Sequence, residues 1–192
     1  RNRAWVLSSW QVVVGEYAKM GKEIKITTIP YEFKGFMGMR NFVMETTDGK
    51  KLAWANTNWT YLTISTGIPT RLTPADTDGY VLSEKLEMDY APRKIKLPED
   101  MISQEAFVVQ KHHLDTNHHV NNCQYICMAE DFLPTDFEIY QMRAEYKMQA
   151  KLGDAICPKV KTEAEKIVVS LDDREGNPYA IVEFQHKKQE LL

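Results

Sequence analysis

The chain has 192 residues with 24 basic and 27 acidic side chains, a formal net charge of −3. With 43% hydrophobic and 27% charged residues its composition is that of a soluble globular protein. No apolar run is long enough to cross a bilayer. The charge balance gives no case for nucleic-acid binding, and an odd count of three cysteines favours a reducing compartment over a disulfide framework. We therefore expect neither a membrane nor a nucleic acid as partner.

The first sixty residues predict antiparallel strands. Their segments are rich in Val, Trp and Ile or alternate between polar and apolar side chains, which is typical of half-buried strands. Asp48-Gly49 between two such segments indicates a hairpin, and Pro30 and Gly35 are expected in the connection before it. The expected strands are 5–14, 22–29, 35–46 and 51–62.

A proline-rich stretch follows, which we interpret as a linker over 63–104. Within it a short helix is expected after Thr73, because Thr73 can cap the helix, Pro74 suits its first turn and Asp76 completes a capping box. Strand character returns over 105–111.

One helix is predicted from His118 to Leu133, ended by Pro134. Its expected buried face carries Val120, Cys123 and Cys127, at spacings of three to four residues, with Ile126 beside them. Four further strands are then expected. They cover 139–150, 155–164, 166–173 and 179–187, with a turn at Gly176-Asn177 between the last two.

Two segments resemble each other, EYAKMGKEIKI (16–26) and EYKMQAKLGDAI (145–156), and each precedes a hairpin with a glycine turn. Duplication of one α+β unit explains this pattern. We expect a first unit over 1–62, the linker, and a second unit over 105–192. The second unit has a helix before its sheet, so the counterpart in the first unit is expected upstream of Arg1.

The stretch DTNHHVNN (115–122) is dense in polar side chains, and three interpretations are open. His119, Cys123 and Cys127 follow one helical stripe and, with His112 or Asp115, could bind zinc. Asp115 or Asn117 could instead simply cap the helix. A catalytic site is the third interpretation, because a helix N-terminus suits a developing oxyanion.

The catalytic interpretation needs an attacking group. Asp115, Asn117 and His119 can supply a base, a hydrogen-bond donor and a proton carrier, but none of them is an obvious nucleophile. Cys123 lies about one helical turn beyond His119, on the expected apolar stripe, where a thiol holds its proton more tightly. An activated water is therefore favoured as the attacker.

DTNHHVNNCQYICMAEDFLP resembles the D-x-N-x-H-V-N-N…Y segment of acyl-acyl carrier protein thioesterases, and the likeness extends through AWVLSSWQVVV and EYKMQAKLGD. This resemblance implies an α+β fold, a tandem hot dog in which two antiparallel sheets each wrap around a central helix. The family's usual first strand and first central helix have no counterpart in this chain. The family terminates fatty-acid synthesis by releasing free fatty acid from the carrier protein.

The resemblance also implies site residues. Asp115, Asn117 and His119 match the family's catalytic Asp, Asn and His. Plant members add a Glu-Cys pair, where this chain has Gln149 and Ala150, so a cysteine mechanism is disfavoured and hydrolysis by water is expected. Asp115, or His119 oriented by Asp115, would take the proton of a water that Gln149 positions. Asn117 and a helix N-terminal N–H would hold the carbonyl, and neither a cofactor nor a metal is required.

Substrate and partner contacts are expected elsewhere. An apolar tunnel for the acyl chain is implied in the first unit, with Trp54, Trp59, Met37 and Met39 as candidates. An acidic carrier protein would meet the basic cluster Arg93, Lys94 and Lys96, or else Lys50 and Lys51.

Two rival functions share the expected fold, namely an acyl-CoA thioesterase and a non-catalytic acyl-binding module. The expected location is the cytoplasm of a bacterium, or the plastid stroma if the source is a plant, where the Gln149-Ala150 departure favours a bacterium. A homodimer stays open.

Overall fold

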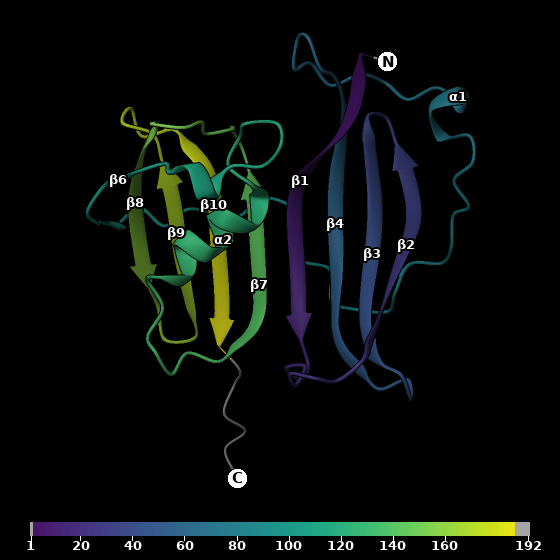
Figure 1. The fold of residues 1–192 in the computed structure, drawn as a ribbon, viewed down its shortest axis with the longest axis horizontal. Coiled ribbons are helices and arrows are strands. Elements are labelled where there is room, and N and C mark those ends of the chain that lie inside the picture. Colours follow the sequence, from purple (N-terminus) through teal and green to yellow (C-terminus); the bar gives the residue numbers. More distant parts are fainter. Residues whose placement is uncertain (1, 187–192) are drawn as a thin grey trace. The chain divides into compact units, whose positions relative to one another are not determined.

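The computed structural model describes residues 2–186 and divides the chain into two compact units, with the boundary between Arg93 and Lys94 (Figure 1). We call them unit 1 and unit 2 and describe each by itself. Among residues 2–186 no helix combines the length and the apolar character that a membrane crossing needs.

Unit 1 is a four-stranded antiparallel sheet with the order β2-β3-β4-β1. Its strands are β1 (Arg3–Val14), β2 (Ile24–Lys34), β3 (Met37–Thr46) and β4 (Lys51–Thr63). All four predicted strands and the Asp48-Gly49 hairpin are present, and Gly49 takes the positive φ of 90° that such turns require. The predicted end of the second strand at Ile29 is wrong, because β2 continues through Pro30. The pairing register shifts just after Pro30, where a residue without an N–H is tolerated.

The segment after β4 contains α1 (Pro74–Thr77), a single turn. The predicted capping box is present, since the Asp76 carboxylate accepts the Thr73 N–H at 2.9 Å. α1 is the only helix within residues 2–93.

Buried side-chain amides anchor the end of unit 1. The Gln11 side chain donates to the Asp89 carbonyl at 2.7 Å and accepts the Ala91 N–H at 2.9 Å. Asn41, which is fully buried, accepts the Leu86 N–H at 3.1 Å. The segment therefore lies along the sheet without forming a strand.

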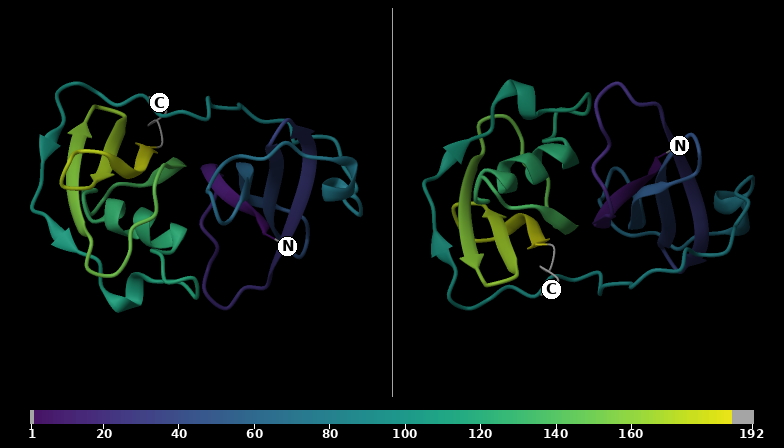
Figure 2. Two further views of the ribbon diagram at one scale, coloured as in Figure 1. Left: turned by 90° about the horizontal axis from the view of Figure 1, so that it is seen from above. Right: turned by 90° about the horizontal axis from the view of Figure 1, so that it is seen from below.

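Unit 2 is built on a sheet with the order β7-β10-β9-β8-β5. Figure 2 shows this sheet curving around α2, which contacts β9 and β10. Its elements are β5 (Ile102–Ser103), β6 (Phe107–Val108), the 3₁₀ turn η1 (Lys111–His113), α2 (Asn122–Glu130), β7 (Ile139–Tyr146), β8 (Ala155–Thr162), β9 (Lys166–Asp172) and β10 (Pro178–His186).

The two units share one topology. The order β2-β3-β4-β1 of unit 1 is matched by β8-β9-β10-β7 in unit 2, and the two similar sequence segments both lead into the first strand of a hairpin pair. This is the arrangement that duplication predicts. The last four predicted strands are present. The predicted end of the first of them at Ala150 is wrong, because β7 stops at Tyr146, and the predicted end of the last one, Lys187, lies outside the described residues.

Three further local predictions in unit 2 are wrong. A strand is expected over 105–111, but only the two residues of β6 are in a strand there, and the turn η1 follows. The helix begins at Asn122 rather than His118, because Asn121 caps it. It ends at Glu130 rather than Leu133. Its buried residues are Tyr125, Met128 and Ala129, whereas the predicted stripe residues Cys123 and Cys127 are exposed. A thiol is small and tolerates either environment, so spacing alone misplaced this face.

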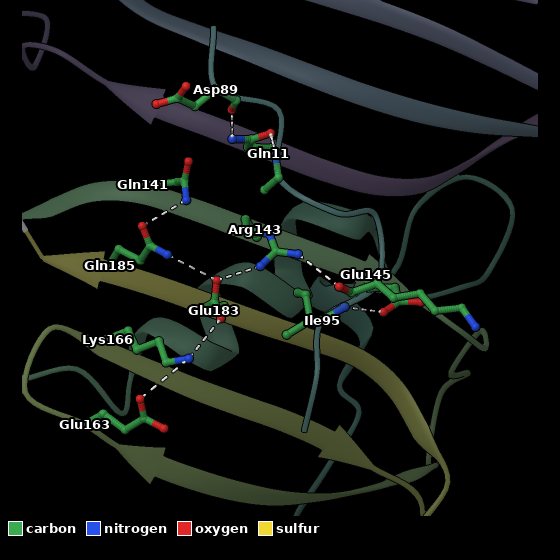
Figure 3. A network of polar contacts seen from close by, with 12 residues as sticks. Gln11, Asp89, Ile95, Gln141, Arg143, Glu145, Glu163, Lys166, Glu183 and Gln185 are labelled. Atoms are coloured by element: carbon green, nitrogen blue, oxygen red, sulfur yellow. Dashed lines mark hydrogen bonds and ion pairs between the residues drawn. The ribbon is translucent and has the colours of Figure 1, made fainter. Parts of the chain in front are cut away.

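A polar network covers the sheet face opposite α2 in unit 2 (Figure 3). Arg143 pairs with Glu183 at 2.9 Å and donates to the Lys94 carbonyl at 3.1 Å. The fully buried Glu145 accepts the Ile95 N–H at 2.9 Å, and the Ile95 side chain packs in a small apolar cluster on the sheet. The network thus fixes the backbone at Lys94 and Ile95.

Candidate active site

Asp115, Asn117 and His119 lie in a tight turn that the Asp115 carboxylate organises. One carboxylate oxygen accepts the N–H of Asn117 at 2.8 Å and that of His119 at 3.3 Å, and the other accepts the Asn117 side-chain amide at 3.2 Å. The Asp115 N–H donates to the His119 carbonyl at 2.8 Å, which closes the turn. His118 sits at the tip with φ of 61° and is exposed. The alternate residues Asp115, Asn117 and His119 are therefore held together.

The environment of Asp115 favours its ionised form. Burial opposes ionisation, but the hydrogen bonds from Asn117 and His119 and the charge of His119 outweigh it, so the pKa of Asp115 is lowered below its ordinary value. A carboxylate that already accepts three hydrogen bonds is a poor proton acceptor. Asp115 is better suited to hold the turn and to balance a positive charge on His119.

The turn precedes α2 rather than forming its first residues. Asn121 caps α2 by accepting the Cys123 N–H at 2.9 Å, so the expectation that Asp115 or Asn117 caps the helix is wrong. The expected oxyanion donor at the helix N-terminus is weakened for the same reason, because the cap already occupies this N–H group.

The segment containing Gln149 lies beside the turn. The Val120 N–H donates to the Ala150 carbonyl at 2.9 Å, and His119 forms a β-bridge with Lys151. Gln149 itself is exposed. The structure thus brings the segment of Gln149 next to the residue that follows His119, although 30 positions separate them in the sequence.

Two side chains of this site make no hydrogen bond with any part of the chain that the structure describes, the imidazole of His119 and the amide of Gln149. Both can therefore bond a substrate or a water. An imidazole accepts a proton, and an amide orients a water without taking its proton. Together with Asn117, they provide the groups that hydrolysis of an activated carbonyl compound requires.

The metal interpretation gains no support from the geometry. No group of three or more His, Cys, Asp and Glu side chains within residues 2–186 could hold an ion. Cys127 is exposed as a residue, but partial desolvation of its thiol, and then the neighbouring Cys123, raise its pKa, so the thiol keeps its proton and is a weak nucleophile or ligand.

Unit 1 contains a pocket of about 300 Å³ on its sheet, near the lower end of the range for small-ligand sites. Met39 and Trp59, two of the four side chains expected to bind substrate, line this pocket, whereas Met37 and Trp54 are not among its lining residues. A Cβ on Gly38 would lie 2.9 Å from the Trp5 ring, so a glycine is needed in this wall. The pocket is lined by Trp5, Pro30, Phe33, Gly38, Met39, Arg40, Phe42, Trp59 and Tyr80.

Sequence reasoning missed Phe33, Phe42 and Tyr80 in this wall. Phe33 lies in β2 and Phe42 in β3. The alternation of side chains along a strand indicates which face of the sheet a residue lies on, but not that this face contains a pocket. Tyr80 comes from the irregular segment after β4 and packs against Phe33 with ring centroids 5.2 Å apart. No sequence signal could have placed it there.

The expected carrier-binding residues Arg93, Lys94 and Lys96 are all exposed. The alternative pair differs, because Lys50 forms an ion pair with Glu16 and Lys51 lies over the Trp54 ring, 5.8 Å from its centroid. The first cluster is therefore better placed to meet an acidic partner.

Two family models match this chain, one in each half. Residues 1–80 match the acyl-ACP thioesterase N-terminal domain, and residues 83–188 match the acyl-ACP thioesterase C-terminal domain. A search of curated protein sequences finds no match.

Similar solved structures share the fold. An acyl-ACP thioesterase from Bacteroides thetaiotaomicron has a TM-score of 0.86 at 19% identity, over 97% of this chain and 77% of that one. The 12:0-ACP thioesterase from Umbellularia californica has a TM-score of 0.84 at 15% identity, over 98% and 77%. A MaoC-like dehydratase from Phytophthora capsici has a TM-score of 0.65 at 13% identity, over 96% and 72%.

These likenesses confirm the α+β tandem hot-dog fold expected from the sequence. The two family matches cover nearly all of the chain, one for each half. The chain belongs to the acyl-ACP thioesterase family and is a thioester hydrolase.

Proposed function

We propose that this enzyme hydrolyses the thioester of a fatty acyl-acyl carrier protein and so releases the free fatty acid that ends fatty-acid synthesis. The observation that carries the proposal is the turn of Asp115, Asn117 and His119, joined through Val120 and Ala150 to the segment of Gln149. The reducing compartment that the cysteines favour, cytoplasm or stroma, is where such a substrate is made.

His119 is the proposed base. The imidazole takes a proton from water while the water oxygen forms a bond to the thioester carbonyl carbon. The C–S bond of the tetrahedral intermediate then breaks, and the departing sulfur takes the proton back from the imidazolium. Asp115 stays ionised throughout, because its lowered pKa suits it to stabilise the imidazolium rather than to be protonated.

Asn117 and Gln149 have the supporting roles. The Asn117 amide gives one N–H to Asp115, which leaves its second N–H for the carbonyl oxygen where negative charge develops. Gln149 accepts from and donates to the attacking water and so aims it at the carbonyl. This division suits a chain in which Gln149 stands where the plant members have a carboxylate.

The acyl chain is proposed to bind in the pocket of unit 1. Its wall is largely aromatic, with Trp59 and Met39 in it, and such a surface gains free energy when it removes an alkyl chain from water, at about 0.8 kcal/mol per buried CH₂. Arg40 is the charged member of the wall, and its guanidinium donates to Thr28 at 2.7 Å, which satisfies part of its polarity.

The test is steady-state hydrolysis of one acyl chain presented on carrier protein and on coenzyme A. Asp115→Asn and His119→Ala should each lower kcat/KM by about 10²–10⁴-fold with an unchanged circular dichroism spectrum. Cys123→Ser is the matched control, since its thiol is exposed and outside the proposed mechanism, and it should keep full activity.

Full activity in both the Asp115 and the His119 variant would refute the proposed site. A higher kcat/KM for the coenzyme A thioester would make the protein an acyl-CoA thioesterase. Binding of acyl thioesters without turnover would make it an acyl-binding module.

A further inference from the structure

Ala150 connects three parts of unit 2 through its backbone N–H and carbonyl groups. Ala150 is fully buried, its N–H donates to the Tyr125 hydroxyl at 2.8 Å, and its carbonyl accepts the Val120 N–H at 2.9 Å. Gln149 precedes this residue and His119 precedes Val120. A single residue therefore links helix α2, the segment of Gln149 and the turn of His119.

Tyr125 makes this link from the buried face of α2. Only 2% of the residue is exposed, so a solvent water could not easily replace its hydroxyl. Burial raises its pKa to about 12, so the hydroxyl stays neutral and keeps its proton over the working range of pH. The hydroxyl oxygen is thus a constant acceptor for the Ala150 N–H.

The rest of the loop between β7 and β8 is tied at both ends. The N–H groups of Lys147 and Met148 both donate to the Tyr179 carbonyl, at 2.8 and 3.2 Å, and the Lys151 N–H donates to the Asp154 carboxylate at 2.8 Å. Gln149 stands between these anchors. Tyr125 supplies the side-chain contact from α2 at the centre of the loop.

The corresponding loop of unit 1 has no buried residue at its centre. It joins β1 to β2, the topological counterparts of β7 and β8, and all of its residues over 15–23 are exposed. The buried anchor at Ala150 is therefore no general requirement of this connection.

We propose that Tyr125 is a positioning residue of the active site, whose hydroxyl fixes Gln149 and, through the Ala150 carbonyl, the backbone beside His119. The proposal rests on the function proposed above. Tyr125 does not touch the substrate and acts through Ala150. Its removal would leave a buried N–H unsatisfied, and the loop would shift to recover a partner for that N–H.

The experiment compares Tyr125→Phe with Tyr146→Phe. Tyr146 is the matched control, because its ring lies 6.1 Å from that of Tyr125 and its hydroxyl donates to the Asn122 carbonyl in α2 at 3.1 Å rather than to a residue of the loop. Each variant loses one shielded tyrosine hydroxyl. Amide hydrogen exchange at Ala150 and Val120 reports the link directly, and kcat and KM are measured separately on an acyl-carrier-protein substrate.

Tyr125→Phe should lower kcat by about 10–100-fold with KM within about twofold, since small displacements of catalytic groups have effects of this size. It should also speed exchange at Ala150 and Val120. Tyr146→Phe should leave both exchange rates and kcat within about twofold of the parent. Equal losses of kcat in the two variants would show a general packing effect and refute the inference.

The outcomes separate this inference from the proposed function. Normal kcat in Tyr125→Phe, with His119→Ala inactive, overturns the positioning role and leaves the site intact. Unchanged exchange at Ala150 in Tyr125→Phe overturns the hydrogen bond itself. If His119→Ala is fully active, the proposed site fails and the catalytic role of Tyr125 fails with it, even if exchange at Ala150 increases.

Discussion

Units 1 and 2 repeat one strand order, β2-β3-β4-β1 and β8-β9-β10-β7, but use their sheets differently. Unit 2 packs α2 against β9 and β10, and the interior strands there are almost completely buried. Unit 1 has no helix longer than the four residues of α1 in its described part, and its sheet carries an aromatic pocket instead.

In the proposed function, the two units of the duplicated fold have different tasks. The proposed catalytic turn in unit 2 is joined to a helix and to a loop that has the buried residue Ala150 at its centre. The pocket of unit 1 has a largely aromatic wall, which suits the acyl chain of the proposed substrate. A hydrogen-bonded turn and an aromatic pocket therefore arise from the same topology.

The largest expected effect is on the stability of unit 2. Phe184 is fully buried, so Phe184→Ala should lower the free energy of unfolding by about 3–5 kcal/mol. Phe42 in the pocket wall of unit 1 is half-buried, and Phe42→Ala should cost about 1–2 kcal/mol. Denaturant unfolding measures both values, and equal losses would contradict the contrast between a packed core and an open pocket.

The pH dependence of activity is the next test, since each unit has a carboxylate that holds a turn. Hydrogen bonds from the Thr73 side chain, then from Tyr61 and the Thr73 backbone, lower the pKa of Asp76 to about 2. The pKa of Asp115 is also lowered. Both groups stay charged down to acid pH, and their stabilising effect is lost only as the pH falls through these lowered values.

An acid limb of kcat/KM between about pH 5 and 8, with activity falling about tenfold per pH unit below it, would therefore belong to a histidine. Asp76→Asn should leave this limb in place, because Asp76 lies outside the site. A limb below about pH 4 would instead assign the base to Asp115.

A smaller effect should separate two tryptophans of β4. Trp59 lines the pocket and Trp54 does not, although both were expected to bind substrate. Trp59→Phe should raise KM for a long acyl chain by about three- to tenfold through lost apolar contact, and Trp54→Phe should leave it within about twofold. A larger effect at Trp54 would mean that the acyl chain binds outside this pocket.

Much of the fold could be predicted from the sequence, because alternating polar and apolar side chains and turn residues indicate strands. The Asp48-Gly49 hairpin and the strands of both units follow from such local signals. The first and last residues of α2 did not follow from local signals. Capping depends on which of several adjacent polar residues accepts a hydrogen bond from a helix N–H group. Asn121, rather than Asp115 or Asn117, reaches the Cys123 N–H.

The site divides in the same way. The grouping of Asp115, Asn117 and His119 follows from their spacing and from the family resemblance. The link from Tyr125 through Ala150 to Val120 joins residues up to 30 positions apart by main-chain hydrogen bonds, and such bonds leave no side-chain pattern in a sequence. The pocket wall likewise includes Tyr80, which lies in an irregular segment whose position no sequence pattern predicts.

The smallest expected effect concerns the carrier protein. A double change of Lys94 and Lys96 to Ala should raise KM for an acyl-carrier-protein substrate by about three- to tenfold at low salt, because positive charge attracts an acidic partner. The effect should disappear at about 1 M salt, where charges are screened beyond about 3 Å. KM for the matching coenzyme A thioester should change less.

This test separates charge from structure, because hydrogen bonds fix the backbone at Lys94 and Ile95. Arg143 and Glu145 bind the main chain at Lys94 and Ile95, so alanine at the two lysines removes charge without loosening the segment. The control is a double change of Lys50 and Lys51 to Ala in unit 1, which removes the same number of positive charges from a site where Lys50 is paired with Glu16. If the control pair raises KM more than Lys94 and Lys96 do, the carrier protein docks on unit 1, and the basic cluster at the unit boundary is an ordinary solvated surface.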